Sequence, residues 1–127
     1  MKPVTEIVEN LVKEVQTASG IRVKVGWISP GDTAPLITIL MHDSDLSPIG
    51  MDESKVLYHL KFQLDIWHTS AKARDEVFDK IVNHFESNRR AFHENYGWFD
   101  VKFAGVTDLE EEGVYRKLTL LRIRVVG

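Results

Sequence analysis

The stretch LKFQLDIWHTSAKARDEVFDKIVNHFESNRR, from Leu60 to Arg90, changes its hydrophobic period partway along. Its first part alternates apolar and polar side chains, which is typical of a strand with one buried face. From Ala73 onwards the apolar residues recur every three or four positions, as on one face of a helix. Thr69 or Ser70, between the two patterns, is available as the helix N-cap. The stretch therefore predicts a strand followed directly by an amphipathic helix that runs to about Arg90.

The apolar faces of this predicted strand and helix are expected to pack together, because the connection between them is too short to let them separate. Together they would form the centre of the core. The two apolar stripes are Leu60, Phe62, Leu64 and Ile66 on the strand, and Val77, Phe78, Ile81 and Phe85 on the helix.

The same two periods predict the elements that precede this unit. A three-and-four spacing of apolar residues indicates a helix from Val4 to the Ser19-Gly20 stop signal. Alternation in IRVKVGW predicts a strand over Ile21–Trp27, and the β-branched run LITILM predicts another after the turn residues of SPGDTAP. These two strands can pair as a hairpin.

After the second helix, WFDVKFAGV predicts a strand, TDLEEEG an acidic turn, and VYRKLTLLRIRVV a long last strand. In the last strand Leu118 and Leu120 have the opposite parity to Leu121, Ile123 and Val125. Either a β-bulge lies near Leu120, or both faces of the strand are partly covered.

The order helix, three strands, helix, two strands contains a single strand–helix–strand crossover. It predicts one α+β domain over residues 1–127, with a mainly antiparallel sheet of about five strands and two helices packed on it. A chain of 127 residues is long enough for one buried core.

Composition excludes several classes of function. A net charge of −3 argues against a general affinity for nucleic acid, and the absence of cysteine removes disulfides, thiolate metal sites and a cysteine nucleophile. The start MKPVTEIVEN has no apolar segment of signal-peptide length, and no apolar run approaches the roughly 20 residues of a membrane span. We therefore expect no membrane association, and a protein made and kept in the cytoplasm or in a particle assembled there.

No motif with catalytic or metal-binding spacing is found. His84 and His93 would lie on opposite sides of a continuous helix, and HDSD, which starts at His42, lacks the central glycine and distal glutamate of a calcium loop. Asp32, in SPGDTAP, has no lysine or second acid at a diagnostic spacing, and a proline-glycine turn explains it. We predict no catalytic residue, no cofactor, no metal and no enzyme activity.

Three features suggest protein contacts instead. The segment His42–Lys55 has no hydrophobic period and exceeds the roughly 4 to 6 residues usual for a connection, so we predict a long binding loop. Trp67 shares the parity of the polar residues of its strand, so it is either an exposed interface anchor or is covered by the second helix or the last strand. The candidate interface residues are Leu46, Ile49, Met51, Trp67, Glu110, Glu111 and Glu112.

Four segments in this order resemble the small neck and tail-completion proteins of tailed phages, also called tail terminator or head-tail joining proteins. They are KVGWISPGDTAPLITIL, QLDIWHTS, AKARDEVFDKIVNHF and YRKLTLLRIRV. The resemblance extends from Val4 to Val126 and lies in the order, length and local pattern of the elements. The segment His42–Lys55 and the acids Glu110 to Glu112 have no counterpart in the family's pattern.

The resemblance implies a structural virion protein, assembled in the host cytoplasm and located in the tail or neck. Such subunits form rings, often of six, and bind copies of themselves together with head connector or tail-tube proteins. Two other classes are open from the sequence. One is an α+β enzyme or ligand-binding domain whose site is built from residues distant in sequence, and the other is a non-viral adaptor with the same fold.

Overall fold

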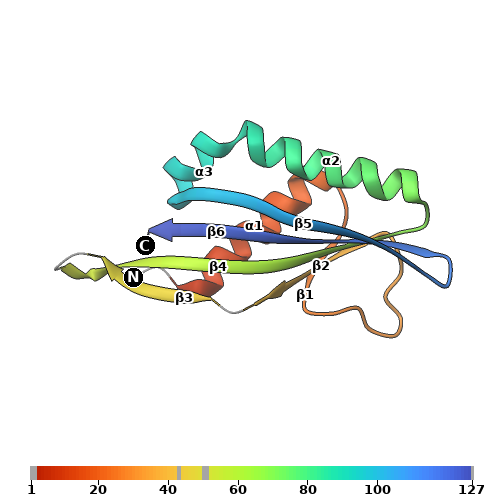
Figure 1. Cartoon of the computed structure of the whole chain (residues 1–127), viewed down its shortest axis with the longest axis horizontal. Helices are drawn as coiled ribbons and strands as arrows, with labels where there is room; N and C mark the ends of the chain where they lie inside the picture. Colours follow the sequence, from red (N-terminus) through yellow and green to blue (C-terminus); the bar gives the residue numbers. More distant parts are fainter. Residues whose placement is uncertain (1–2, 43, 50–51, 127) are drawn as a thin grey trace.

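The computed structural model describes residues 3–42, 44–49 and 52–126. Three helices and six strands lie in this part of the chain (Figure 1). Their order is α1 (Val4–Ser19), β1 (Val23–Val25), β2 (Leu36–Met41), β3 (Asp45–Ile49), β4 (Asp52–His68), α2 (Ala71–Ser87), α3 (Arg89–Tyr96), β5 (Trp98–Glu111) and β6 (Val114–Val126). The predicted α+β class is confirmed, and β3 and α3 are additional to the predicted elements.

The strands form one sheet in the order β1-β2-β4-β6-β5, and β3 pairs with the first part of β4. All pairs are antiparallel except β1 and β2, which are parallel. The expectation of a hairpin between these two strands is therefore wrong. A hairpin requires a tight reversal, whereas residues 26–35 carry the chain back along β1 so that β2 starts at the same end.

The core lies between one face of the sheet and the helices, and Figure 1 shows α2 running along the top of the strands. The predicted packing of β4 against α2 is confirmed, because the Leu60 stripe and Val77, Ile81 and Phe85 are all buried in one cluster. Phe78 is the exception. It is only partly buried, with its ring 6.2 Å from that of Phe103 on β5.

The boundary between α2 and α3 explains why one helix was expected where two exist. The α2 helix begins as predicted, since Ser70 Oγ accepts a hydrogen bond from the backbone N–H of Ala73 at 3.1 Å. At Asn88 the helical backbone is interrupted (φ −112°, ψ 16°). The new direction of α3 places Phe92 in the core, with its ring 5.2 Å from those of Phe85 and Trp98.

The predicted loop over His42–Lys55 is largely a hairpin built from β3 and the start of β4. Backbone pairing runs from Asp45 opposite His59 to Pro48 opposite Val56, with an irregularity between Pro48 and Ile49. The loop expectation is wrong because strands at the end of a sheet can pair through their backbones without an alternating apolar pattern. None of the described helices is long and apolar enough to cross a membrane.

The last two strands form a long hairpin whose turn is shorter than predicted. Residues 107–111 of the expected acidic turn belong to β5, and the ladder continues to Glu111 opposite Val114. The ladder is irregular between Ala104 and Val106, which pair with Leu120 and Thr119. Gly105 occupies this bulge with φ +73°, a conformation that suits glycine. A bulge therefore does lie beside Leu120, but in the partner strand.

Candidate interaction surfaces

The face of the sheet opposite the helices, called the open face below, contains a buried ion pair. Asp65 on β4 is fully buried, and Arg116 Nε on β6 donates to its Oδ1 at 2.9 Å. Gln63 Nε2 donates to the other carboxylate oxygen at 2.8 Å. The carboxylate is thus hydrogen-bonded on both oxygens, as a buried charge requires.

Two tryptophans enclose the guanidinium of Arg116. Its Cζ lies 4.8 Å from the ring centroid of Trp27 and 4.9 Å from that of Trp67, and the two rings meet edge to face at 5.3 Å. Trp67 Nε1 also donates to Thr38 Oγ1 at 3.0 Å. Trp67 therefore lies outside the core face, as predicted, but it is 5% exposed and covered by Trp27 and Arg116. The alternative in which it is an exposed anchor is wrong.

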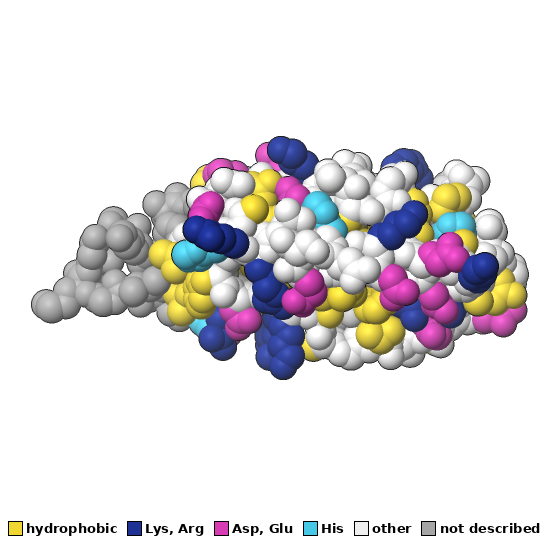
Figure 2. Space-filling view, turned by 90° about the horizontal axis from the view of Figure 1, so that it is seen from above, with side chains coloured by type: hydrophobic (Ala, Val, Ile, Leu, Met, Phe, Trp, Pro, Cys, Tyr) yellow, Lys and Arg dark blue, Asp and Glu magenta, His cyan; other side chains and the backbone are white. Residues whose placement is uncertain are grey.

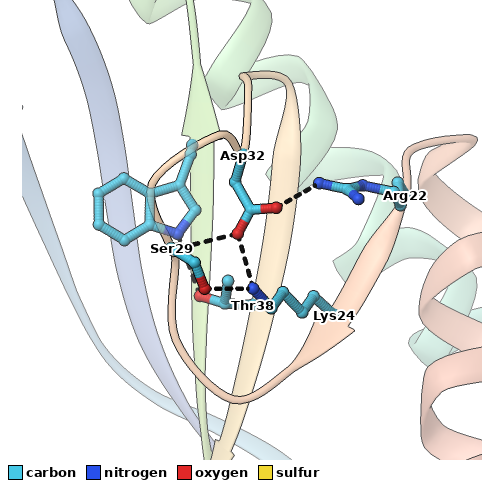
Figure 3. A network of polar contacts seen from close by, with 6 residues as sticks. Arg22, Lys24, Ser29, Asp32 and Thr38 are labelled. Atoms are coloured by element: carbon cyan, nitrogen blue, oxygen red, sulfur yellow. Dashed lines mark hydrogen bonds and ion pairs between the residues drawn. The ribbon is translucent and has the colours of Figure 1, made fainter.

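The segment that carries Trp27 is held to β1 by Asp32 (Figure 3). Its carboxylate accepts hydrogen bonds from Arg22 Nη2 at 3.0 Å, Lys24 Nζ at 2.7 Å and the backbone N–H of Ser29 at 2.8 Å. The Asp32 N–H donates back to the Ser29 carbonyl, and Gly31 has φ +95°, which closes the proline-glycine turn. The hydrogen bond from Lys24, followed by those from Ser29 and Arg22, holds the pKa of Asp32 far below its ordinary value.

Two histidines elsewhere, His84 and His42, form contacts that support the fold. His84 Nε2 lies 3.0 Å from Glu14 Oε1, and Tyr96 donates to Glu14 Oε2 at 2.7 Å, so Glu14 links α1 to α2 and α3. Burial, followed by this hydrogen bond, raises the pKa of Tyr96 to about 12. His42 Nε2 contacts Gln63 Oε1 at 2.8 Å. No three His, Asp or Glu residues of the described ranges are placed to share a metal ion.

A second group of ion pairs lies where α2 begins, on the helix side of the sheet. Lys117 Nζ is 2.8 Å from Asp108 and 3.2 Å from Asp75, and Arg74 contacts both acids. Hydrogen bonds from Arg74 and then Lys117 lower the pKa of Asp75. Arg74 and Lys117 are both only 7% exposed. Because Arg74 and Asp75 are on α2, whereas Asp108 and Lys117 are on β5 and β6, this buried cluster ties α2 to the β5–β6 hairpin.

The acidic residues Glu110, Glu111 and Glu112 form the tip of the β5–β6 hairpin. All three are exposed, and in Figure 1 this tip lies at the opposite end of the molecule from β3. Glu111 has one distant ion pair, at 3.9 Å from Arg116. The backbone at Glu112 has φ +49°, in the left-handed region that non-glycine residues rarely adopt. We call these three residues the acidic tip.

A row of cations that the sequence analysis did not identify crosses the open face. Lys61 on β4 lies directly opposite Arg122 on β6, and Arg122 lies opposite Lys102 on β5. All three are exposed, and none has an ion pair with another described residue, whereas the adjacent Arg124 pairs with Asp100 at 3.6 Å. We call Lys61, Lys102 and Arg122 the cationic row. A shallow hollow of about 250 Å³ beside it is lined by His42, Lys61, Ala104, Leu120 and Arg122.

The charges on the helix side are arranged differently. There Lys and Arg side chains are interspersed with Asp and Glu (Figure 2). Ion pairs on this side include Lys72 with Glu76 at 3.9 Å and Arg89 with Glu86 at 2.7 Å, both between residues one helical turn apart. What distinguishes the cationic row is that its three cations lie directly opposite one another, whereas Lys13 and Lys80, which also have no ion pair among the described residues, lie on separate helices.

The remaining candidate interface residues lie in the β3–β4 hairpin. Leu46 and Ile49 are on β3, opposite Tyr58 and Asp52, and Met51 lies outside the described residues. The hairpin is at one end of the molecule and the acidic tip at the other (Figure 1), so the structure does not bring the predicted interface residues together.

No protein-family model matches the sequence, and no curated protein matches it. Among solved structures, the chain is similar to a chain of a structure described as the virion of native gene transfer agent (GTA) particle. The two chains are 13% identical with a TM-score of 0.52, and the match covers 89% of this chain and 84% of that chain. The match shows a shared fold.

Proposed function

We propose that this protein is a structural subunit of a virion or virion-like particle, and that it completes the tail or joins the tail to the head. In this role it closes into a ring, often of six copies, between the head connector and the tail tube. The observation that carries the proposal is the fold shared with a chain of the gene transfer agent virion over 89% of this chain. The order of the elements in the sequence resembles the tail-completion family independently of that match.

The surfaces of the molecule support a role in assembly. A ring subunit must contact neighbours on two sides, and this chain carries the β3–β4 hairpin and the acidic tip at opposite ends (Figure 1). Its polar clusters instead support the fold: Asp32 is held by two cations and a backbone N–H, and Asp65 by Arg116 and Gln63. Such fully hydrogen-bonded clusters make the subunit rigid, so that its contact surfaces keep their shape in the assembled particle.

The proposal is tested by deleting the gene from a strain that produces the particle and imaging the products by electron microscopy. We expect filled heads and separate tails that accumulate unjoined, or tails of abnormal length, and recovery of whole particles when the gene is restored. Whole particles at the normal yield in the deletion strain would rule the proposed role out. The purified protein is then examined with connector and tail-tube proteins for rings by native mass spectrometry.

A further inference from the structure

The cationic row is costly for an isolated subunit. Like charges directly opposite one another on a sheet destabilise it, and here two such pairs share Arg122. Each cation also sits between two core residues along its strand, as Lys61 does between Leu60 and Phe62. The side chains are therefore fixed on the open face and cannot turn to the helix side. A local conflict of this kind is expected at a functional site, where a partner neutralises the charge.

The acidic tip has the complementary charge and a similar length. Neighbouring strands are about 4.8 Å apart, so the cationic row spans about 10 Å, while three consecutive residues span at most about 7 Å between their outer Cα atoms. Glu110 and Glu112 have no ion pair among the described residues. Leu109 and Val114, which flank the tip, are partly exposed apolar residues, and the hollow beside the row has apolar side chains in Ala104 and Leu120.

The tip of a subunit cannot reach the row of the same subunit. Both lie on the β5–β6 hairpin, where Arg122 is eight residues from Val114, or roughly 26 Å along an extended strand. The ladder between them is continuous apart from the bulge at Gly105, so the hairpin cannot fold back. The partner that offers these acids is therefore a different molecule.

We propose that the cationic row Lys61, Lys102 and Arg122 binds the acidic tip Glu110, Glu111 and Glu112 of a second copy of this chain. This inference rests on the proposed function and names the contact through which the ring forms. The contact is head-to-tail, because each subunit offers its tip to one neighbour and its row to another. Contacts of this type close into a ring when the rotation between subunits permits.

A charge-swap experiment tests the contact. One variant carries Glu110→Lys, Glu111→Lys and Glu112→Lys, and the other carries Lys61→Glu, Lys102→Glu and Arg122→Glu. Each alone would place like charges at every contact, so each should self-associate at least about tenfold more weakly than the natural chain by sedimentation velocity. An equimolar mixture should regain association, because the reversed tip of one variant fits the reversed row of the other and the natural pair remains.

The matched control reverses three exposed lysines on the helix-bearing side, Lys13→Glu, Lys72→Glu and Lys80→Glu, with the same change in net charge. It should associate as the natural chain does. If the reversed row prevents folding, judged by circular dichroism, glutamine replaces the three cations and the loss of association is measured instead. Association of the natural chain should weaken as salt is raised, because exposed charges are screened.

Weak association is detected by cross-linking, for which the absence of natural cysteine gives a clean background. A Glu111→Cys chain is mixed with a Lys102→Cys chain and oxidised, and the control mixture replaces the latter with Lys80→Cys. We expect the tip–row heterodimer to form about tenfold faster than the control, as an effective-concentration effect requires. Equal rates in the two mixtures would overturn the proposal.

Two further outcomes separate this inference from the proposed function. If the mixed charge-swap variants fail to associate while the natural chain still forms rings with its partners, the proposed contact is wrong and the proposed function stands. If a 30-base-pair DNA duplex binds the natural chain and the tip variant but not the row variant, in fluorescence anisotropy at about 0.15 M salt, the row is a nucleic-acid site and the proposal is overturned.

Discussion

Arg116 on β6 donates from Nε to the fully buried carboxylate of Asp65 on β4, at 2.9 Å. Removing one member of a buried ion pair leaves the other charge uncompensated, which typically costs about 3 to 5 kcal/mol. We therefore expect Arg116→Ala to lower the free energy of unfolding by that amount in urea denaturation. Arg124→Ala, which removes an exposed cation from the same strand, should change it by less than about 0.5 kcal/mol. Similar small losses for both variants would contradict this account of the open face.

Arg116→Lys provides a finer test of the tryptophan enclosure. Lysine keeps the charge but lacks the planar group that fits between Trp27 and Trp67. We expect a loss of about 1 to 2 kcal/mol of unfolding free energy, together with a change in the near-ultraviolet circular dichroism of the two indoles. A stability equal to that of the natural chain would show that only the charge of Arg116 matters.

Truncation of the two phenylalanines in the core stripes should have unequal effects. Phe62→Ala removes a fully buried ring and should cost about 3 to 5 kcal/mol, a large share of the stability of a small domain. Phe78→Ala removes a partly buried ring and should cost about 1 to 2 kcal/mol. Both values come from denaturant unfolding, and an inverted order would mean that α2 docks in a different orientation.

Asp32→Asn should lower the melting temperature at pH 7, because it removes the charge that holds Arg22, Lys24 and Ser29 together. The pKa of Asp32 is lowered in the folded protein, so its contribution is fully present above the ordinary carboxyl pKa of about 4 and is lost as pH falls further. The difference in melting temperature between the two proteins should therefore be constant from pH 7 to about pH 5 and should narrow towards pH 2. Asp79→Asn, at an exposed position on α2, is the control and should leave the melting temperature unchanged. A gap that stays the same at low pH would mean that the charge of Asp32 is not what holds the turn.

Tyr96 gives the opposite pH dependence. Its pKa is raised to about 12 against an ordinary value of about 10, so the stability it contributes is present below pH 10 and is lost as pH rises towards 12. Tyr96→Phe cannot ionise at this position, so its stability relative to the natural chain should rise between pH 10 and pH 12. Thermal unfolding across this range measures the difference, and parallel pH profiles for the two proteins would contradict the prediction.

Deletion of Ser47 to Asp52 is expected to shorten the β3–β4 hairpin and leave the domain folded. β3 pairs with β4, and its pairs Asp45 with His59 and Leu46 with Tyr58 lie outside the deleted residues. We expect a nearly unchanged melting temperature together with a loss of assembly, scored as head-to-tail joining or as binding to partner proteins. An unfolded variant would place the hairpin in the core, and normal assembly would place the interface elsewhere.

Sequence reasoning succeeded where burial fixes the pattern. The change of period within Leu60–Arg90 predicted β4, α2 and their packing because each of these elements buries one continuous stripe in the same core. It failed for strand pairs whose partner or direction does not depend on which side chains are buried. The β3 strand has no apolar alternation, and the parallel direction of β1 and β2 depends on the path of residues 26–35, which alternation does not encode.

The open face was difficult to predict because its contacts join residues far apart in the sequence. Trp67 was recognised as unusual from its parity, but its cover by Trp27, 40 positions away, depends on the turn that Asp32 closes. The cationic row does have a signal, in the three similar segments LKF, VKF and LRI, each with a cation between two apolar residues. Only the strand register shows that these cations are neighbours.

The bulge at Gly105 divides β5 into two parts with separate registers against β6. Before the bulge, Val101 and Phe103 face the helices, and after it Asp108 faces that side and meets Lys117. Thr119 Oγ1 donates to the Gly105 carbonyl at 2.9 Å, which satisfies the backbone group that leaves the ladder. Adding two residues to each strand beyond the bulge would therefore lengthen the hairpin by about 7 Å without changing the face of any core residue. The length of the hairpin can thus be changed while the packing of the core stays the same.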